Sequence, residues 1–264
     1  MSFSGKVVLI TGASSGIGAD AARHLASKGA SVSIVGRNEK RLNEVAKEII
    51  KAGHPTPLAI VADVTKDPER IIKETIKHFG KLDVLVNNAG IFGDDSVVNF
   101  DVNEFDRIIN TNLKSVVVLT SLAVPHLERS RGNIINVSSI CGLRAFDSYM
   151  SYCISKAGLD QFTKCAALTL ASKKIRVNSL NPAVIKTPIF EAIGINESNE
   201  AQFYEERKND YLVGRVGEVS DTSSAIAYLA SESFVNGILL PVDGGIMASG
   251  LGSGANGCNI SLSH

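Results

Sequence analysis

The 264-residue sequence predicts a single α/β domain built on a doubly wound, seven-stranded parallel sheet. Short apolar runs rich in β-branched residues alternate with longer stretches whose apolar residues recur at helical spacing, a pattern typical of βαβ units. The apolar runs are unbroken, which indicates strands covered by helices on both faces. A chain of this length buries about 75% of its surface in one core, so a second domain is not required.

The expected elements follow one another along the chain. Strands are predicted at residues 7–10, 31–35, 58–61, 84–86, 133–137, 176–181 and 238–242. Helices are predicted at residues 17–28, 39–51, 67–79, 103–129, 149–173 and 219–230. Gly29 is a plausible stop for the first helix, and Pro125 is expected to bend or end the fourth.

Two segments depart from this alternation. Residues 187–217 are expected to form a mobile lid over the site, within a catalytic domain of residues 1–248. Residues 249–264 are rich in glycine and serine, and we expect them to form a flexible tail.

Charge and composition argue against several classes of partner. The 27 basic and 27 acidic side chains balance, and no basic run is present, so neither nucleic acid nor an anionic membrane is expected as a partner. No run reaches the ~18 consecutive apolar residues of a spanning helix, and the first residues lack a signal-peptide pattern. The four cysteines and five histidines share no metal-ligand spacing. We therefore expect a cytoplasmic protein without a bound metal.

A glycine-rich turn follows the first predicted strand and opens the first predicted helix. Its glycines are Gly12, Gly16 and Gly18, and they would let the backbone turn tightly beside a helix amino terminus, where free N–H groups bind phosphate. The turn therefore predicts a nucleotide site that also includes Ser14, Ser15 and Ile17.

The residue after the second strand bears on which dinucleotide would bind. An acidic residue there would bind the ribose 2′-OH, but this chain has Arg37, whose guanidinium suits a 2′-phosphate. The sequence therefore favours NADP(H) over NAD(H); the alternative is that Arg37 only caps a surface helix. Asp63 and Val64 end the third strand, where the carboxylate could bind adenine or simply be solvated. Asn88, Ala89 and Gly90 end the fourth strand, where their small side chains suit packing beside the cofactor.

Tyr152 and Lys156 lie four residues apart in a predicted helix, so their side chains share one face. A phenol has a pKa of about 10, and a neighbouring ammonium is expected to lower it. Ser139 precedes the tyrosine by thirteen positions. Together with the nucleotide site, this grouping predicts proton transfer beside a bound nucleotide, although a lone tyrosine and lysine at this spacing would most often be surface residues.

In combination, these motifs resemble the short-chain dehydrogenase/reductase family from Lys6 to Gly245. The matching pieces are Thr11–Gly18, Asp63, Asn87–Gly90, Asn112, Ser139, Tyr152, Lys156, Asn181-Pro182 and Pro241–Gly245. The resemblance implies a Rossmann fold. It is strongest to the short, single-domain branch that includes 3-oxoacyl-carrier-protein reductases and carbonyl reductases, which implies a homotetramer, or a dimer.

The resemblance also implies a role for each catalytic residue. Tyr152 would be the general acid in reduction and the base in oxidation, and Ser139 would hydrogen-bond the substrate carbonyl. Lys156 would hold the nicotinamide ribose and lower the tyrosine pKa. Asn112 would kink its helix and anchor a water that passes protons from Lys156 to solvent. Three further residues match the segment near the nicotinamide carboxamide: Pro182, Ile185 and Thr187.

The expected activity is NADP(H)-dependent hydride transfer between the nicotinamide and a moderately hydrophobic ketone or secondary alcohol, with Tyr149 and Phe190 lining the substrate pocket. The alternatives are an NAD-dependent alcohol or sugar dehydrogenase and a non-catalytic NADP(H)-sensing protein. Two departures from the family are expected to affect the region near the last strand. Ala183 stands where glycine is usual, and the segment 230–237 is short.

Overall fold

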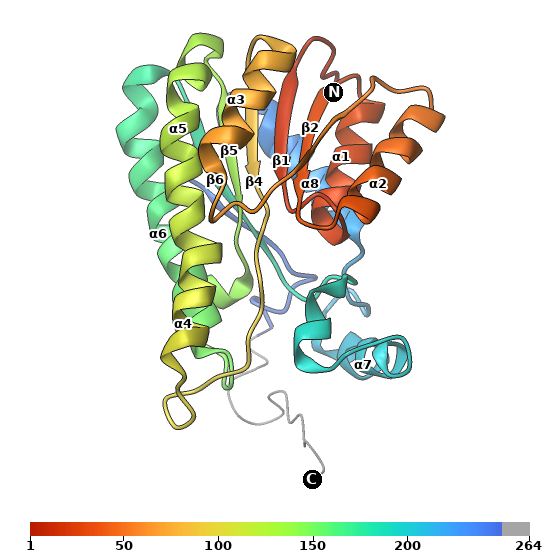
Figure 1. The fold of residues 1–264 in the computed structure, drawn as a ribbon. Helices are drawn as coiled ribbons and strands as arrows, with labels where there is room; N and C mark the ends of the chain where they lie inside the picture. Colours follow the sequence, from red (N-terminus) through yellow and green to blue (C-terminus); the bar gives the residue numbers. More distant parts are fainter. Residues whose placement is uncertain (250–264) are drawn as a thin grey trace.

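The computed structural model describes residues 1–249 and contains, within them, a seven-stranded parallel sheet (Figure 1). The strand order is β3-β2-β1-β4-β5-β6-β7. The strands are β1 (Val7–Thr11), β2 (Ser31–Gly36), β3 (Leu58–Val61), β4 (Val84–Asn87), β5 (Asn133–Val137), β6 (Arg176–Pro182) and β7 (Leu239–Val242). The predicted fold class and strands are confirmed. The proposed tail, apart from Ser249, lies outside the described residues.

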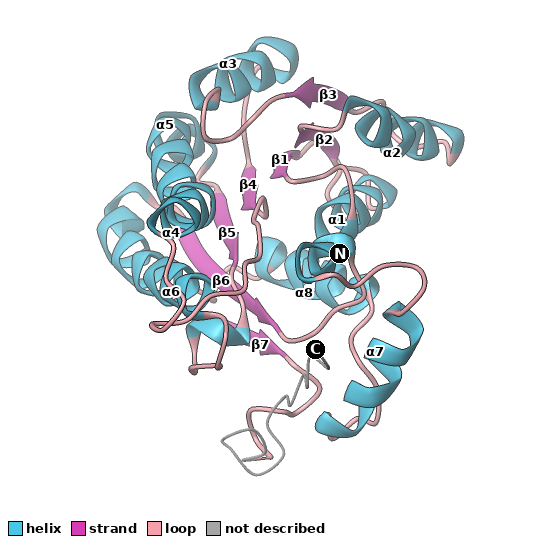
Figure 2. Ribbon diagram, turned by 60° about the horizontal axis from the view of Figure 1, so that its bottom comes forward, coloured by secondary structure: helices cyan, strands magenta, loops and turns pink. Residues whose placement is uncertain are grey.

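Helices cover both faces of the sheet (Figures 1 and 2). One layer contains α1 (Gly16–Ser27), α2 (Glu39–Lys51) and α8 (Val219–Ser231). The other contains α3 (Pro68–Phe79), α5 (Ser115–Ser130) and α6 (Met150–Leu170). A 3-10 turn, Ala171–Lys173, completes the stretch that was expected to be helical to residue 173.

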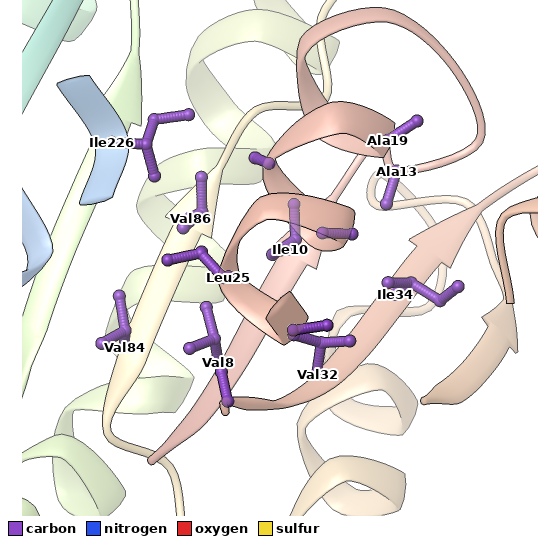
Figure 3. Close-up of a cluster of buried hydrophobic side chains, with 14 of the residues drawn as sticks. Val8, Ile10, Ala13, Ala19, Leu25, Val32, Ile34, Val84, Val86 and Ile226 are labelled. Atoms are coloured by element: carbon purple, nitrogen blue, oxygen red, sulfur yellow. The ribbon is translucent and has the colours of Figure 1, made fainter. Parts of the chain in front are cut away.

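Each strand contributes side chains alternately to two hydrophobic cores, one on each face of the sheet, because successive side chains point to opposite faces. Val8 and Ile10 of β1 pack into the core under α1, α2 and α8, whereas Val7 and Leu9 pack into the core under α3, α5 and α6. Figure 3 shows the first of these cores, with strand side chains packed against Leu25 of α1. All four β1 side chains are nearly inaccessible to solvent, as the unbroken apolar run predicted.

The fourth predicted helix is longer and less regular than expected. It consists of α4 (Val102–Ile109), a π-helical turn (Asn110–Lys114) and α5. Pro125 does not end the helix, since it lies inside α5; that it bends the helix remains a prediction. The irregular turn surrounds Asn112. By length and composition alone the stretch Val102–Ser130 could cross a membrane. Its residues Leu119 and Leu127 are buried in the core, so here it acts as a core helix.

The carboxyl ends of the parallel strands lie at one edge of the sheet, and the strand order reverses between β1 and β4. Ligands of doubly wound sheets bind at such a point. The predicted lid segment lies beyond this edge and contains a 3-10 turn (Pro188–Ile193), α7 (Glu200–Arg207) and a second 3-10 turn (Lys208–Asp210). In Figure 1, α7 stands apart from both helical layers. That the segment moves remains a prediction.

Candidate active site

The glycine-rich turn connects β1 to α1 and needs glycine for two different reasons. Gly12 and Gly16 have positive φ, +65° and +53°, which residues with a side chain rarely adopt. A Cβ on Gly12 would also lie 2.8 Å from the Ala89 Cα atom. A Cβ on Gly18 would lie 2.5 Å from the Gly12 carbonyl oxygen. Gly18 therefore lies behind the turn, where it lets α1 approach the loop; Gly12 and Gly16 line a cavity at this turn and Gly18 does not.

Hydrogen bonds tie the ends of β1 and β4 together. The Thr11 hydroxyl oxygen accepts from the backbone N–H groups of Asn88 and Ala89, each at 3.0 Å. The Asn88 side chain donates back to the carbonyls of Thr11 and Gly12, at 2.9 and 3.2 Å. These bonds fix the two loops as one floor at the point where the strand order reverses.

A cavity of about 420 Å³ lies on this floor. The predicted cofactor residues in its wall are Gly12, Ser14, Ser15, Gly16, Ile17, Arg37, Asp63, Val64, Asn88, Ala89, Gly90 and Thr187. The amino terminus of α1 borders the cavity and has neither a side-chain cap nor an acidic residue in its first turn. Its N–H groups and dipole are therefore available to an anion, so the cavity fits a dinucleotide with its pyrophosphate at this helix end.

Arg37 is exposed at the rim of this cavity, and among residues 1–249 it forms no hydrogen bond or salt bridge. The alternative that it caps a helix is wrong, because Asn38 caps α2 by accepting from the Arg41 N–H at 3.0 Å. Arg41 lines the same cavity, a second cation that the sequence analysis missed. Burial opposes ionisation of Asp63, but hydrogen bonds from Thr65 and the charge of Arg37 outweigh it and lower the carboxyl pKa.

A second, smaller cavity of about 150 Å³ adjoins the first. Ser139, Tyr152 and Lys156 line it and are all buried. Ser139 follows β5; its oxygen accepts from the Cys141 N–H at 3.1 Å, and its hydroxyl donates to the Pro182 carbonyl at 3.5 Å. Tyr152 and Lys156 project from α6, with the ammonium 5.5 Å from the centroid of the tyrosine ring. The three predicted side chains therefore converge on one small space.

The electrostatics of this group differ from the prediction. Burial raises the pKa of the Tyr152 hydroxyl, and the polar Ser139 side chain beside it offsets this only in part. The predicted lowering of the tyrosine pKa is therefore not found, and the phenol is protonated at neutral pH. Burial also lowers the pKa of Lys156 to about 8, against the attraction of Asp160. The Lys156 ammonium donates to the Val137 carbonyl at 2.9 Å, which fixes its position.

Asn112 lies in the π-helical turn and holds the loop after β4. Its side chain accepts from the Ile91 N–H and donates to the Ile91 carbonyl, each at 2.9 Å, and donates to the Ser155 hydroxyl at 3.1 Å. Ser155 in turn donates to the Tyr152 carbonyl at 2.7 Å. Asn112 thus connects the cofactor floor to α6; the water that it was expected to anchor remains a prediction.

The start of α6 has a second anchor that the sequence analysis missed. Asp95 is buried, and its carboxylate accepts from the backbone N–H of Ser151 at 2.9 Å and from the Ser151 hydroxyl. The loop after β4 therefore fixes the residue directly before Tyr152. No signal in the sequence distinguishes Asp95 from its exposed neighbour Asp94.

Aromatic rings form one wall of the smaller cavity. Tyr149 and Phe190 lie in this wall as predicted, together with Pro182, Ile185 and Thr187. Phe92 was missed: its ring centroid lies 4.7 Å from that of Tyr149 and 4.6 Å from that of Tyr152. It lies in an irregular loop, where no periodicity marks it. Ala183 also lines the cavity, and its φ is not positive, so the absence of glycine there imposes no backbone strain.

Within residues 1–249, no group of three or more His, Cys, Asp or Glu side chains could hold a metal ion. The side chains that converge beside the nucleotide cavity are the hydroxyls of Ser139 and Tyr152 and the ammonium of Lys156. This arrangement defines a Rossmann-type oxidoreductase.

Comparison with known proteins identifies the family. Residues 6–198 match the short chain dehydrogenase family. The chain is 34% identical to L-fucose dehydrogenase of Bos taurus over 247 residues, covering 92% of this chain and 90% of that protein. It is also 34% identical to a 3-oxoacyl-[acyl-carrier-protein] reductase of Thermotoga maritima over 251 residues, covering 94% and 100%.

A solved structure gives the same result. A short-chain dehydrogenase/reductase of Caenorhabditis elegans, of unknown function and crystallised with cofactor, has a TM-score of 0.89 and 35% identity over 93% of this chain and 96% of that one. The protein described here belongs to the short-chain dehydrogenase/reductase family. It is an oxidoreductase that acts on carbonyl or alcohol groups with NAD(H) or NADP(H).

Proposed function

We propose that this protein is an NADP(H)-dependent carbonyl reductase that uses Tyr152 as its general acid. The observation that carries the proposal is a buried, protonated phenol beside Ser139 in a small cavity that adjoins the nucleotide cavity. The two cavities share wall residues: Ile17, Asn88, Gly90, Phe92, Thr187 and Ile189. A ketone in the smaller cavity therefore lies beside a dinucleotide in the larger one.

Each of the site residues has a separate role in the reduction of the ketone. A bound nicotinamide supplies the hydride. The Ser139 hydroxyl donates to the carbonyl oxygen, and the Tyr152 hydroxyl gives its proton to that oxygen as negative charge develops on it. The Lys156 ammonium, held by Val137, lies close enough to stabilise the resulting phenolate. Asn112 and Asp95 position the loop after β4 and the start of α6 relative to each other.

Turnover of a panel of ketones and diketones, followed by NADPH absorbance, tests the activity. We expect turnover of moderately hydrophobic members, because the smaller cavity is lined mainly by aliphatic and aromatic side chains. A panel that is inert despite tight NADPH binding would contradict the proposal and favour an NADP(H)-sensing protein. Turnover with NADH alone would favour an NAD-dependent alcohol or sugar dehydrogenase.

The preference for NADP(H) is proposed from Arg37 and Arg41, two of the cations that line the nucleotide cavity. Arg37→Asp should lower the ratio of NADPH to NADH affinity by roughly tenfold to a hundredfold, because it replaces a phosphate ligand with a repelling charge. Lys40→Asp is the matched control, since Lys40 is exposed and outside the cavity wall. An unchanged ratio in Arg37→Asp would refute the assignment.

A homotetramer, with a dimer as the alternative, is proposed from apolar side chains left exposed on two surfaces. Val117, Ile154 and Leu168 are exposed on α5 and α6, and Phe234 and Ile238 are exposed beside β7. Light scattering on the purified protein measures the assembly, and a monomer would contradict this proposal.

A cytoplasmic location is also proposed, because Cys141, Cys153 and Cys165 are free thiols, as a reducing compartment would keep them. Cell fractionation tests it.

A further inference from the structure

We propose that Arg207 recognises an anionic group of the substrate, so that the preferred ketones carry a carboxylate at the far end of an apolar body. This inference deepens the proposed function and rests on it. It depends on three observations: an aromatic wall that leads away from Tyr152, a guanidinium at the end of this wall, and the few partners of that guanidinium.

The aromatic wall runs from the catalytic tyrosine to the lid. The Phe92 ring centroid lies 4.6 Å from that of Tyr152 and 5.9 Å from that of Phe190. The Phe190 centroid lies 5.2 Å from that of Phe203 in α7. All four rings line the same cavity. A substrate whose carbonyl meets Tyr152 would therefore lay an apolar body along these rings.

Arg207 is the last residue of α7 and lies at the far end of the aromatic wall. Its guanidinium carbon lies 3.8 Å from the Phe203 ring centroid, and its Nη1 donates to the Phe203 carbonyl at 3.2 Å. It lines the cavity that also contains Ser139 and Tyr152, and it is half-buried. The ring and the carbonyl together fix the guanidinium at the cavity wall, so little side-chain freedom remains to be lost on binding.

The remaining donors of Arg207 have no acceptor among residues 1–249, and Arg207 forms no salt bridge with them. The neighbouring carboxylates have other partners: Glu205 pairs with Lys208, and Glu206 accepts from Gln202 at 2.8 Å. The other cation in the cavity wall, Lys156, is committed to the Val137 carbonyl and to the reaction. Of the two cations that line this cavity, Arg207 is therefore the one that can bind an anionic group of a ligand.

A planar guanidinium matches a carboxylate through two parallel hydrogen bonds, and such charge-assisted bonds are about twice as strong as neutral ones. The phenylalanine rings keep water away from one side of this pair, which strengthens it. The substrate class that fits is an oxo acid with three parts in order: a ketone, an apolar spacer and a terminal carboxylate.

The test uses linear keto acids with the ketone at the penultimate carbon and spacers of increasing length, each compared with its own methyl ester. The ester keeps the spacer and the ketone but loses the charge. At the best spacer length the wild-type enzyme should prefer acid to ester in kcat/KM by at least about tenfold. In Arg207→Met this ratio should fall to about one. Arg207→Lys should keep part of it, because the charge remains but the planar fork is lost.

Lys164→Met is the control, because it removes one exposed positive charge that forms no ion pair among residues 1–249 and does not line either cavity. It should keep the acid preference of the wild-type enzyme. If Lys164→Met lowers the ratio as much as Arg207→Met does, the preference comes from surface charge in general and the inference is overturned.

Calorimetric titration of acid and ester into the complex of the enzyme with NADPH separates this inference from the proposed function. Equal affinity of wild-type enzyme for acid and ester overturns the role of Arg207, even if neutral ketones are reduced. Tighter binding of the acid that Arg207→Met abolishes supports the role, even if the proposed reduction fails.

Discussion

The two halves of the active site are held together by different forces. On the cofactor side, the loops after β1 and β4 are joined by hydrogen bonds from Thr11 and Asn88, and a glycine packs against them where no Cβ fits. On the substrate side, the wall consists mainly of ring contacts between Phe92, Phe190 and Phe203. The cofactor half is thus specified by directional bonds and contacts at short range, and the substrate half by apolar packing.

Directional bonds and excluded volume leave few acceptable residues, whereas ring contacts accept many shapes at small cost. We therefore expect substitutions on the cofactor side to damage stability or chemistry and those on the substrate side to change which substrate is used. Four experiments test this contrast.

Tyr152→Phe, at the boundary of the two halves, should have the largest effect. Removing the hydroxyl removes the proton donor, and we expect kcat to fall roughly a thousandfold, or about 4 kcal/mol in the barrier. NADPH affinity and the circular dichroism spectrum should not change. Steady-state kinetics measures the loss, and turnover within a factor of a few of wild type would exclude Tyr152 as the general acid.

Lys156→Met should change how stability depends on pH. The folded-state pKa of Lys156 is about 8, below its ordinary 10.5, so the unfolded chain binds more protons between these values. The stability of the wild-type protein should therefore rise, relative to Lys156→Met, as the pH increases from 8 to 10.5, by up to about 3 kcal/mol. Urea unfolding at several pH values measures this difference. If the unfolding free energies of the two proteins changed in parallel with pH, the lowered pKa of Lys156 would be contradicted.

The stability cost of Gly18→Ala, on the cofactor side, is compared with that of Gly194→Ala in the lid segment. An alanine Cβ at position 18 would overlap the Gly12 carbonyl, and we expect a loss of about 2–3 kcal/mol in unfolding free energy together with weaker NADPH binding. Gly194 has a φ of +82° but open space around its Cα, so Gly194→Ala should cost only about 1 kcal/mol. Denaturant titration compares the two. Equal losses would remove the contrast between the halves.

Phe190→Ala should have a small effect on stability, about 1 kcal/mol, because the ring is half-buried. Its effect on KM should be larger, several-fold for aromatic or long-chain ketones, while NADPH affinity should be unchanged. Phe100→Ala removes an exposed ring outside both cavities and serves as the control. A change in NADPH affinity for Phe190→Ala would show that the halves are not separable at this residue.

The same contrast explains what the sequence could predict. Strand positions follow from unbroken apolar runs, and the nucleotide cavity follows from glycine spacing and strand ends, so Gly12, Asn88 and Arg37 could be assigned from the sequence alone. Both signals are local in the chain. The predicted Ser139, Tyr152 and Lys156 do meet, because β5 and α6 bring them to one place.

Predictions failed where long-range burial decides the outcome. The Tyr152 pKa depends on how far the ring is buried, and the spacing to Lys156 gives no measure of this. Pro125 was expected to bend or end its helix, but α5 continues through it, so it does not end the helix. Phe92, Asp95 and Arg207 lie in a loop or at a helix end, and only the folded chain shows what they contact.

The wall shared by the two cavities has a consequence for how such a protein can change. Ile17, Gly90, Phe92 and Thr187 border both spaces, so a replacement there alters the fit of two ligands at once. A new ketone is more readily accommodated through the lid residues Phe190 and Phe203, which line the smaller of these two spaces and not the larger. Divergence toward other substrates at a constant nucleotide preference should accordingly accumulate in α7 and the turn before it.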